Sequence, residues 1–150
     1  MSKIIQALLT GMFFTFFLDF FLFLGIKINY IDLYEIDLYY NILFADHQNI
    51  YLFMTLSVIF GYLVIYVKNS KVSISVIGFL SILVLSTLIE DVGNKVGEDL
   101  LMSKDRVLRV GKFNYEGDIV YNGRNKISFY DYQLKKIITL DKNKLKGQDR

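Results

Sequence analysis

Asp19 is the one carboxylate within a long apolar run, residues 4–26. Hydrocarbon cannot solvate a carboxylate, so such a group inside a membrane faces protein or trapped water. Three roles suit it: proton transfer, pairing with a basic or hydroxyl group of another membrane protein, or a structural role as a neutral or hydroxyl-bonded carboxyl. The other two apolar runs contain no Lys, Arg or His that could pair with it. We favour assembly or structure over proton handling.

A stripe of small and polar residues leads to Asp19 along one side of the predicted first helix. Residues spaced four apart share a helix face, and counting back from Asp19 gives Thr15, Gly11 and Ala7. Phe and Leu cover most of the remaining surface of this run. We call these four residues the small-residue stripe, and we predict that the first helix uses it to contact other helices or a partner.

Most enzymatic and metal chemistry lacks the residues that it needs in this chain. The sequence contains no Cys and a single His, His47, so a zinc site built from cysteine or histidine ligands is excluded. Patterns typical of nucleotide-binding loops, serine hydrolases, zinc proteases and EF-hand loops are missing from it. We expect a protein that is not an enzyme and that holds no metal and no cofactor.

Three apolar runs, at residues 4–28, 50–67 and 72–89, predict membrane-spanning helices. A helix needs about 20 apolar residues to cross a hydrocarbon core of about 30 Å, with about 17 as the practical minimum. Hydrophobic residues make up 53% of the chain, which leaves too few polar residues to wrap three apolar rods in water. The first run is also longer than the apolar core of a signal peptide. The predicted fold class is a mainly α membrane protein with three transmembrane helices and a small C-terminal β-meander.

The second and third runs form a predicted helical hairpin, because only residues 68–71 join them. Ser57 and Gly61 make a small pair on the second run, and Gly78 and Ser81 lie on one side of the third. Small residues let helix backbones approach closely in lipid. We expect both faces to pack against the small-residue stripe.

The third helix is predicted to continue beyond its apolar run to residue 102. Gly93 and Gly97 lie four apart in this extension, beside a parallel apolar stripe. A glycine costs a helix interior roughly 1 kcal/mol relative to alanine. The pair therefore indicates either a close helix contact that offsets this cost or a flexible neck, and both alternatives stay open.

A tyrosine-rich loop connects the first two apolar runs. It contains Tyr30, Tyr34, Tyr39 and Tyr40, and the tetrapeptide Ile-Asp-Leu-Tyr occurs in it twice. Tyrosine prefers the lipid–water interface, where its ring is apolar and its hydroxyl is hydrated. We expect an interfacial lid that lies on the bilayer, with a partner-binding patch as the alternative, because exposed aromatic residues mark contact surfaces.

Residues 105–150 are predicted to form a small basic β-rich tail, separate from the helical region of residues 1–104. Alternating patterns predict strands at 107–113, 118–121, 126–130 and 137–140, with turns at Glu116-Gly117 and Asn122-Gly123. A meander this small seldom folds alone, so we expect it to pack on its own helices, on another copy or on a different protein. Its eleven Lys and Arg against six Asp and Glu favour contact with anionic lipid headgroups or protein over nucleic acid.

Charge gives the membrane orientation little support. Three lysines lie near the span ends on each side of the predicted membrane, while acids in the tyrosine-rich loop and after the third span weakly favour a cytoplasmic N-terminus. The tail is then periplasmic. The abundance of Ile, Phe, Tyr, Lys and Asn is typical of an AT-rich bacterial genome, so we expect the bacterial inner membrane.

These features predict a protein that acts by contact. The hypothesis is a small accessory subunit that assembles or stabilises a larger bacterial membrane complex in a chaperone-like way. Its partners would be other integral membrane proteins or further copies of itself. The alternative is a homo-oligomeric proton or cation channel, or a transporter subunit, that uses Asp19.

Overall fold

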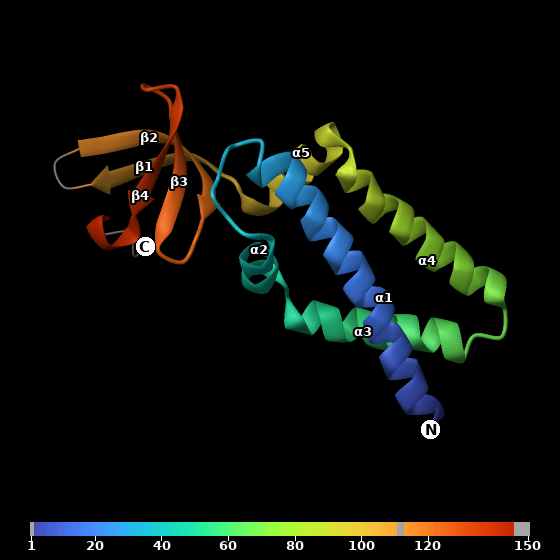
Figure 1. Cartoon of the computed structure of the whole chain (residues 1–150). Helices are drawn as coiled ribbons and strands as arrows, with labels where there is room; N and C mark the ends of the chain where they lie inside the picture. Colours follow the sequence, from blue (N-terminus) through green and yellow to red (C-terminus); the bar gives the residue numbers. More distant parts are fainter. Residues whose placement is uncertain (1, 111–112, 146–150) are drawn as a thin grey trace.

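The computed structural model describes residues 2–110 and 113–145. Within these residues, helices fill the N-terminal part and a four-stranded antiparallel sheet follows them (Figure 1). Two helices are long and apolar enough to cross a membrane, or three if a bent pair counts as one span. The sheet lies near the C-terminal end of α1, and the N-terminus and the α3–α4 connection lie away from it (Figure 1).

Ser2 caps the N-terminus of helix α1 (Lys3–Ile26), because its hydroxyl accepts a hydrogen bond from the Ile5 N–H. It continues without a break into a π-helical turn, η1 (Lys27–Ile31), so that the helical rod runs over Lys3–Ile31. The predicted first span at residues 4–28 is confirmed as a helix. The wider turn buries Asn29, Tyr30 and Ile31 together, and this directs the end of the rod into the protein core.

The second predicted span, residues 50–67, forms a helix that is two residues shorter than predicted and that follows a sharp bend. Helix α2 (Tyr40–His47) meets α3 (Ile50–Ile65) at an angle of 84°. The Asn49 side chain caps α3 by accepting from the N–H groups of Tyr51 and Leu52. At 1.5 Å per residue, α3 is about 24 Å long, less than a hydrocarbon core of about 30 Å. Helix α3 alone is therefore shorter than a span of ordinary thickness, and α2, which meets it at nearly a right angle, adds little length along the same axis.

The third predicted helix is not continuous to residue 102, so that prediction is wrong. Helix α4 (Ser70–Leu85) ends in a 3₁₀ turn, η2 (Ser86–Leu88), and an extended residue, Ile89, separates it from α5 (Glu90–Leu101). The Asn29 amide donates to the Thr87 carbonyl over 2.8 Å. In a continued helix that carbonyl would accept from the residue four positions later. A side chain from η1 thus supplies the bond that ends the helix.

The sheet has the order β1-β2-β3-β4, so the four predicted strands are present. The second, third and fourth extend beyond their predicted bounds, whereas the first lies at residues 103–110 in place of 107–113, and Phe113 already belongs to the second strand. The Glu116-Gly117 turn is wrong, because both residues pair with β1 inside a longer β2. The β2–β3 hairpin forms as expected, although Asn122 still belongs to β2 and pairs with Ile127. Residues 111–112 and 146–150 of the predicted tail lie outside the described residues. The strands are β1 (Ser103–Val110), β2 (Phe113–Asn122), β3 (Lys126–Asp131) and β4 (Lys136–Asp141), followed by η3 (Lys142–Lys144).

The sheet has apolar contacts on both faces. One face carries a small core of its own, formed by Leu108, Ile119, Ile127 and Phe129. An isolated antiparallel bridge also joins Val110, at the end of β1, to Leu145, which follows η3. On the other face Val120 and Tyr121 share a core with helical residues. The tail therefore packs on its own helices, the first of the three expected arrangements. The helical members of the shared core are Phe23, Ile26, Tyr30, Ile31 and Leu43.

Candidate functional site

The small-residue stripe is the contact between α1 and α3. Ala7, Gly11 and Thr15 are buried, and a Cβ atom on Gly11 would lie 1.7 Å from the Ser57 carbonyl oxygen. A Cβ atom on Gly61 would lie 2.1 Å from the Ala7 carbonyl oxygen. The two backbones therefore touch, and only glycine fits at both crossing positions.

Hydroxyl groups at this crossing bond within the protein. Thr15 donates to the Gly11 carbonyl over 2.9 Å, and Ser57 donates to the Phe53 carbonyl over 2.7 Å. The Ser57 hydroxyl also lies 3.3 Å from the Thr15 hydroxyl. Because α3 covers the stripe, its buried residues serve packing inside one chain and leave no open face for a partner helix.

The third-span residues do not join this contact, contrary to expectation. Nothing lies within 4 Å of a Cβ atom placed on Gly78, and Ser81 is only half-buried. Helix α4 leaves α3 after the connection between them and comes close to α1 only near the C-terminal end of α1, where Thr87 lies against Gly25 (Figure 1). Near its start, Ser73 donates to the Leu63 carbonyl over 2.5 Å. A cavity of about 430 Å³ remains beside Phe14, Val64 and Gly78.

Asp19 lies beyond the buried part of the stripe and has a different partner from those expected. Its carboxylate accepts a hydrogen bond from the Gln48 amide over 3.2 Å, whereas Thr15 and Ser57 bond elsewhere. Both Asp19 and Gln48 line a cavity of about 300 Å³ between α1, the α2–α3 bend and α5. His47 lines the same cavity.

Three consecutive residues at the α2–α3 bend contact two different parts of the structure, the β2–β3 hairpin and α1. Asp46 accepts from the Arg124 guanidinium, with Nε 2.8 Å from Oδ1. The His47 ring lies 5.7 Å from the Tyr121 ring, and Gln48 bonds to Asp19. The bend therefore joins α1 to the β2–β3 hairpin. The sequence shows the polar triplet between two apolar segments, but nothing in it identifies the partners.

No family model, curated protein or solved structure gives a significant match to the chain. The functional argument for this protein therefore depends on its own residues.

The predicted tyrosine surface is divided between core and solvent. Tyr30 is fully buried, so its expected place at the lipid–water interface is wrong. The Tyr40 hydroxyl donates to the Phe20 carbonyl over 3.1 Å, while Tyr39 is 71% exposed. Burial and the nearby Glu98 carboxylate raise the pKa of Tyr34. Of the four predicted loop residues, Tyr39 is the most exposed, while Tyr34 and Tyr40 are half-buried.

Gly93 and Gly97 form close contacts. A Cβ atom on Gly93 would lie 2.1 Å from the Thr87 carbonyl oxygen, and one on Gly97 would lie 2.4 Å from Cγ of Tyr30. Both glycines are buried. Of the two alternatives for this pair, the structure shows the close contact. Helix α5 packs against η1 and η2 and also contacts β2.

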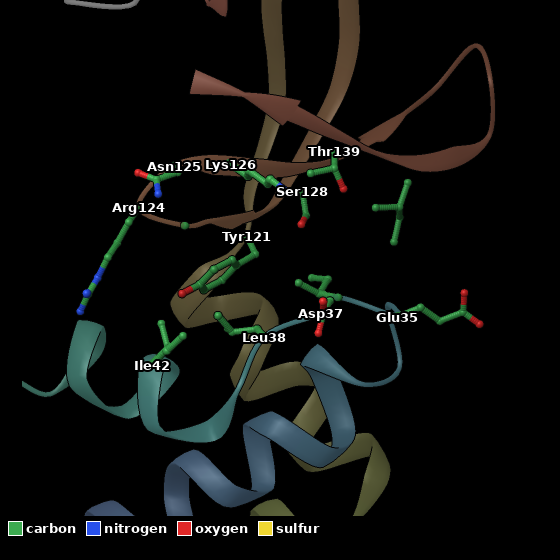
Figure 2. Close-up of a pocket in the computed structure, with 13 residues that line it drawn as sticks. Glu35, Asp37, Leu38, Ile42, Tyr121, Arg124, Asn125, Lys126, Ser128 and Thr139 are labelled. Atoms are coloured by element: carbon green, nitrogen blue, oxygen red, sulfur yellow. The ribbon is translucent and has the colours of Figure 1, made fainter. Parts of the chain in front are cut away.

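A third cavity, of about 450 Å³, lies between the loop before α2 and the face of the sheet (Figure 2). We call it the loop–sheet pocket. Tyr121, Ser128 and Thr139 lie opposite one another on β2, β3 and β4, so their hydroxyls share one face. Asp37 lies on the facing loop (Figure 2). Burial and the nearby Asp46 carboxylate raise the pKa of Tyr121.

Proposed function

We propose that this chain is a small integral membrane protein of the bacterial inner membrane that serves as an accessory subunit of a larger membrane complex. Its role is to assemble or stabilise that complex by protein–protein contact. The buried hydroxyls of Thr15, Ser57, Ser73 and Thr87 all donate to main-chain carbonyls. Hydroxyls that donate to main-chain carbonyls stabilise the packing of the helices, which fits a protein that acts by protein–protein contact.

The exposure of α4 is the observation that carries this proposal. Only 11% of the apolar window in Ser70–Leu88 is buried within the chain, against 28% in Lys3–Ile31. Ile74, Phe79 and Ile82 are each more than half exposed, and Gly78 is open beside them. An open glycine on an apolar helix lets a second helix approach closely in lipid. Helix α4 is therefore the face that we assign to a partner helix.

The tail supports the same role outside the bilayer. A shared core and the Tyr30–Val120 hydrogen bond attach the sheet to the end of the α1 rod. A partner that binds the sheet therefore acts on the membrane helices as well. We place the N-terminus in the cytoplasm and the tail in the periplasm, with its basic residues close to anionic headgroups. Polybasic segments gain about 1 kcal/mol for each Lys or Arg near such a surface.

Site-specific photocrosslinking in native membranes tests the proposal. A photoreactive side chain at Phe79 on α4 should give one discrete protein adduct. The same group at Val58, which is exposed on α3, should label lipid only. Gly78→Leu should remove the Phe79 adduct without unfolding the chain, because Gly78 has open space around it. A protein that purifies strictly alone in mild detergent and gives no adduct at Phe79 would contradict the proposal.

The cavity around Asp19 favours a second candidate function, a proton or cation pathway in a homo-oligomer. Asp19, Gln48 and His47 line one cavity of about 300 Å³, and carboxylates in apolar helices often mark ion pathways. Ion flux into liposomes that is lost in Asp19→Asn and kept in Asp19→Glu would favour this candidate. Equal flux from the wild type and Asp19→Asn would exclude it.

A further inference from the structure

The loop–sheet pocket has walls of opposite charge. Glu35 and Asp37 belong to the loop before α2, whereas Arg124 and Lys126 belong to the β2–β3 hairpin. Arg124 lies at one side of the pocket and the Asp37 carboxylate lies toward the other (Figure 2). Among the described residues, no ion pair joins the loop acids to the hairpin bases. The two walls face each other across a cavity and do not neutralise each other by contact.

Hydrogen-bond donors gather at the hairpin wall. Arg124 uses Nε and Nη2 for Asp46, which leaves its Nη1 group for another acceptor. The Tyr121 hydroxyl points toward the Arg124 side of the pocket (Figure 2). The Lys126 ammonium adds further donors to the same wall. An anionic group would find the Arg124 and Lys126 donors here, with the buried Tyr121 hydroxyl on the Arg124 side.

Tyr121 gives independent support for a ligand. The residue is only 4% exposed, and its hydroxyl has no hydrogen-bond partner among the described residues. Buried polar atoms in folded proteins almost always have a partner, and an exception calls for an explanation such as a water or ligand. Tyr121 lines the pocket, but its hydroxyl oxygen is fully buried, so a group bound at the hairpin wall satisfies this hydroxyl only if the surrounding side chains move aside.

We propose that the loop–sheet pocket binds a small zwitterion that carries a primary ammonium at one end and an anionic phosphate at the other, as phosphoethanolamine does. The ammonium lies toward Asp37 and Glu35, and the phosphate lies toward Arg124, Lys126 and the Tyr121 hydroxyl. Ser128 and Thr139 contact the polar middle of the molecule. The cavity of about 450 Å³ is within the range of about 300–1,000 Å³ that is usual for small-molecule sites.

This chemistry has two sources, a soluble phosphoethanolamine and the headgroup of phosphatidylethanolamine. The pocket lies beside the loop that follows the apolar rod Lys3–Ile31, so a headgroup from the adjacent leaflet has a short path to it. The inference concerns this pocket alone and does not depend on the accessory function proposed for α4.

Calorimetric titration of the full-length chain in maltoside micelles tests the proposal. O-phosphoethanolamine should bind, whereas ethanolamine and inorganic phosphate, titrated separately, should bind at least about tenfold more weakly, because each engages one wall only. Asp37→Asn and Lys126→Gln should each lower the affinity for O-phosphoethanolamine by about tenfold. Glu116→Gln removes an equal charge from an exposed position outside the pocket and should change nothing. Lys126→Arg, which keeps the charge, should restore binding and show that the loss is not caused by misfolding.

Native mass spectrometry from nanodiscs separates the two sources. The nanodiscs contain equal amounts of phosphatidylethanolamine and phosphatidylglycerol. Selective retention of phosphatidylethanolamine by the wild type, lost in Asp37→Asn, assigns the site to the lipid headgroup. Binding of free O-phosphoethanolamine without lipid retention assigns it to a soluble molecule. The proposal is overturned if neither form binds, if phosphate alone binds as tightly as the zwitterion, or if the Asp37 and Lys126 variants bind like the wild type.

Discussion

The Tyr30 hydroxyl donates a hydrogen bond of 2.8 Å to the Val120 carbonyl. Both residues are fully buried, although ninety positions separate them in the sequence. Val120 is the extra residue where the β2–β3 register shifts between Ile119 and Tyr121. A bulge leaves its residue outside the regular ladder, so the Val120 carbonyl is free to accept from a helix. This bond is the polar part of the joint between α1 and the sheet.

Replacing Tyr30 with Phe should loosen this joint. The ring keeps its packing, but the buried Val120 carbonyl loses its partner, which costs about 1–3 kcal/mol. We expect a lower free energy of unfolding and faster hydrogen exchange in β2, measured by mass spectrometry in detergent. Tyr39→Phe removes a hydroxyl from an exposed ring and should leave exchange in β2 unchanged. Equal exchange in both variants would show that the bond does not hold the sheet.

Gly11 and Gly78 should respond in opposite directions to the same substitution. Gly11→Ala places a Cβ atom 1.7 Å from the Ser57 carbonyl oxygen, so α1 and α3 must separate, at a cost of about 1–3 kcal/mol or more. Gly78→Ala meets open space and gains about 0.5–1 kcal/mol of helix propensity. Thermal unfolding in detergent, followed by circular dichroism, measures both. A Gly11→Ala protein as stable as the wild type would exclude the backbone contact.

Local patterns predicted those parts of this fold that depend on nearby residues. The spacing of Ala7, Gly11 and Thr15 identified the packing face of α1, since residues four apart share a face in any helix. The end of α4 depends on Asn29, which comes 58 positions earlier, and no local pattern reports it. The prediction of a turn at Glu116-Gly117 was wrong for a similar reason. Gly117 sits against the Tyr130 carbonyl of a neighbouring strand, and a partner strand is not visible in a local turn signal.

The candidate site shows the same division. The isolation of Asp19 in an apolar run pointed to a protein contact, and its carboxylate does contact the Gln48 side chain. The identity of Gln48 could not be predicted, because the 84° bend between α2 and α3 brings it there. The loop–sheet pocket was missed altogether. Its hydroxyl row exists only because the strand register aligns Tyr121, Ser128 and Thr139.

Tyr132 should titrate at higher pH than an ordinary tyrosine. Its hydroxyl donates to Asp118 over 2.6 Å and to Asp105 over 3.1 Å as alternative acceptors, and the bond to Asp118 is the main cause that raises its pKa. The folded state thus holds this proton more tightly than the unfolded state. The stabilisation is fully present below pH about 10 and is lost as pH rises through the raised pKa. Carbon-13 NMR of labelled tyrosine, with Tyr132→Phe for assignment, follows the titration. In Asp118→Asn the midpoint should fall, and an unchanged midpoint would contradict the assigned cause.

Tyr121 offers a substitution that should make the ligand-free protein more stable. Its ring is buried in the shared core, while its hydroxyl has no partner among the described residues. Tyr121→Phe keeps the ring and removes the unpaired hydroxyl, which relieves a desolvation penalty of about 1–3 kcal/mol. Most core substitutions destabilise, so a higher free energy of unfolding in urea would be diagnostic. Tyr121→Ala, which also removes the ring, should destabilise by about 3–5 kcal/mol, as large aromatic truncations do. If Tyr121→Phe is instead less stable without ligand, the hydroxyl already has a partner in the free protein, such as a bound water.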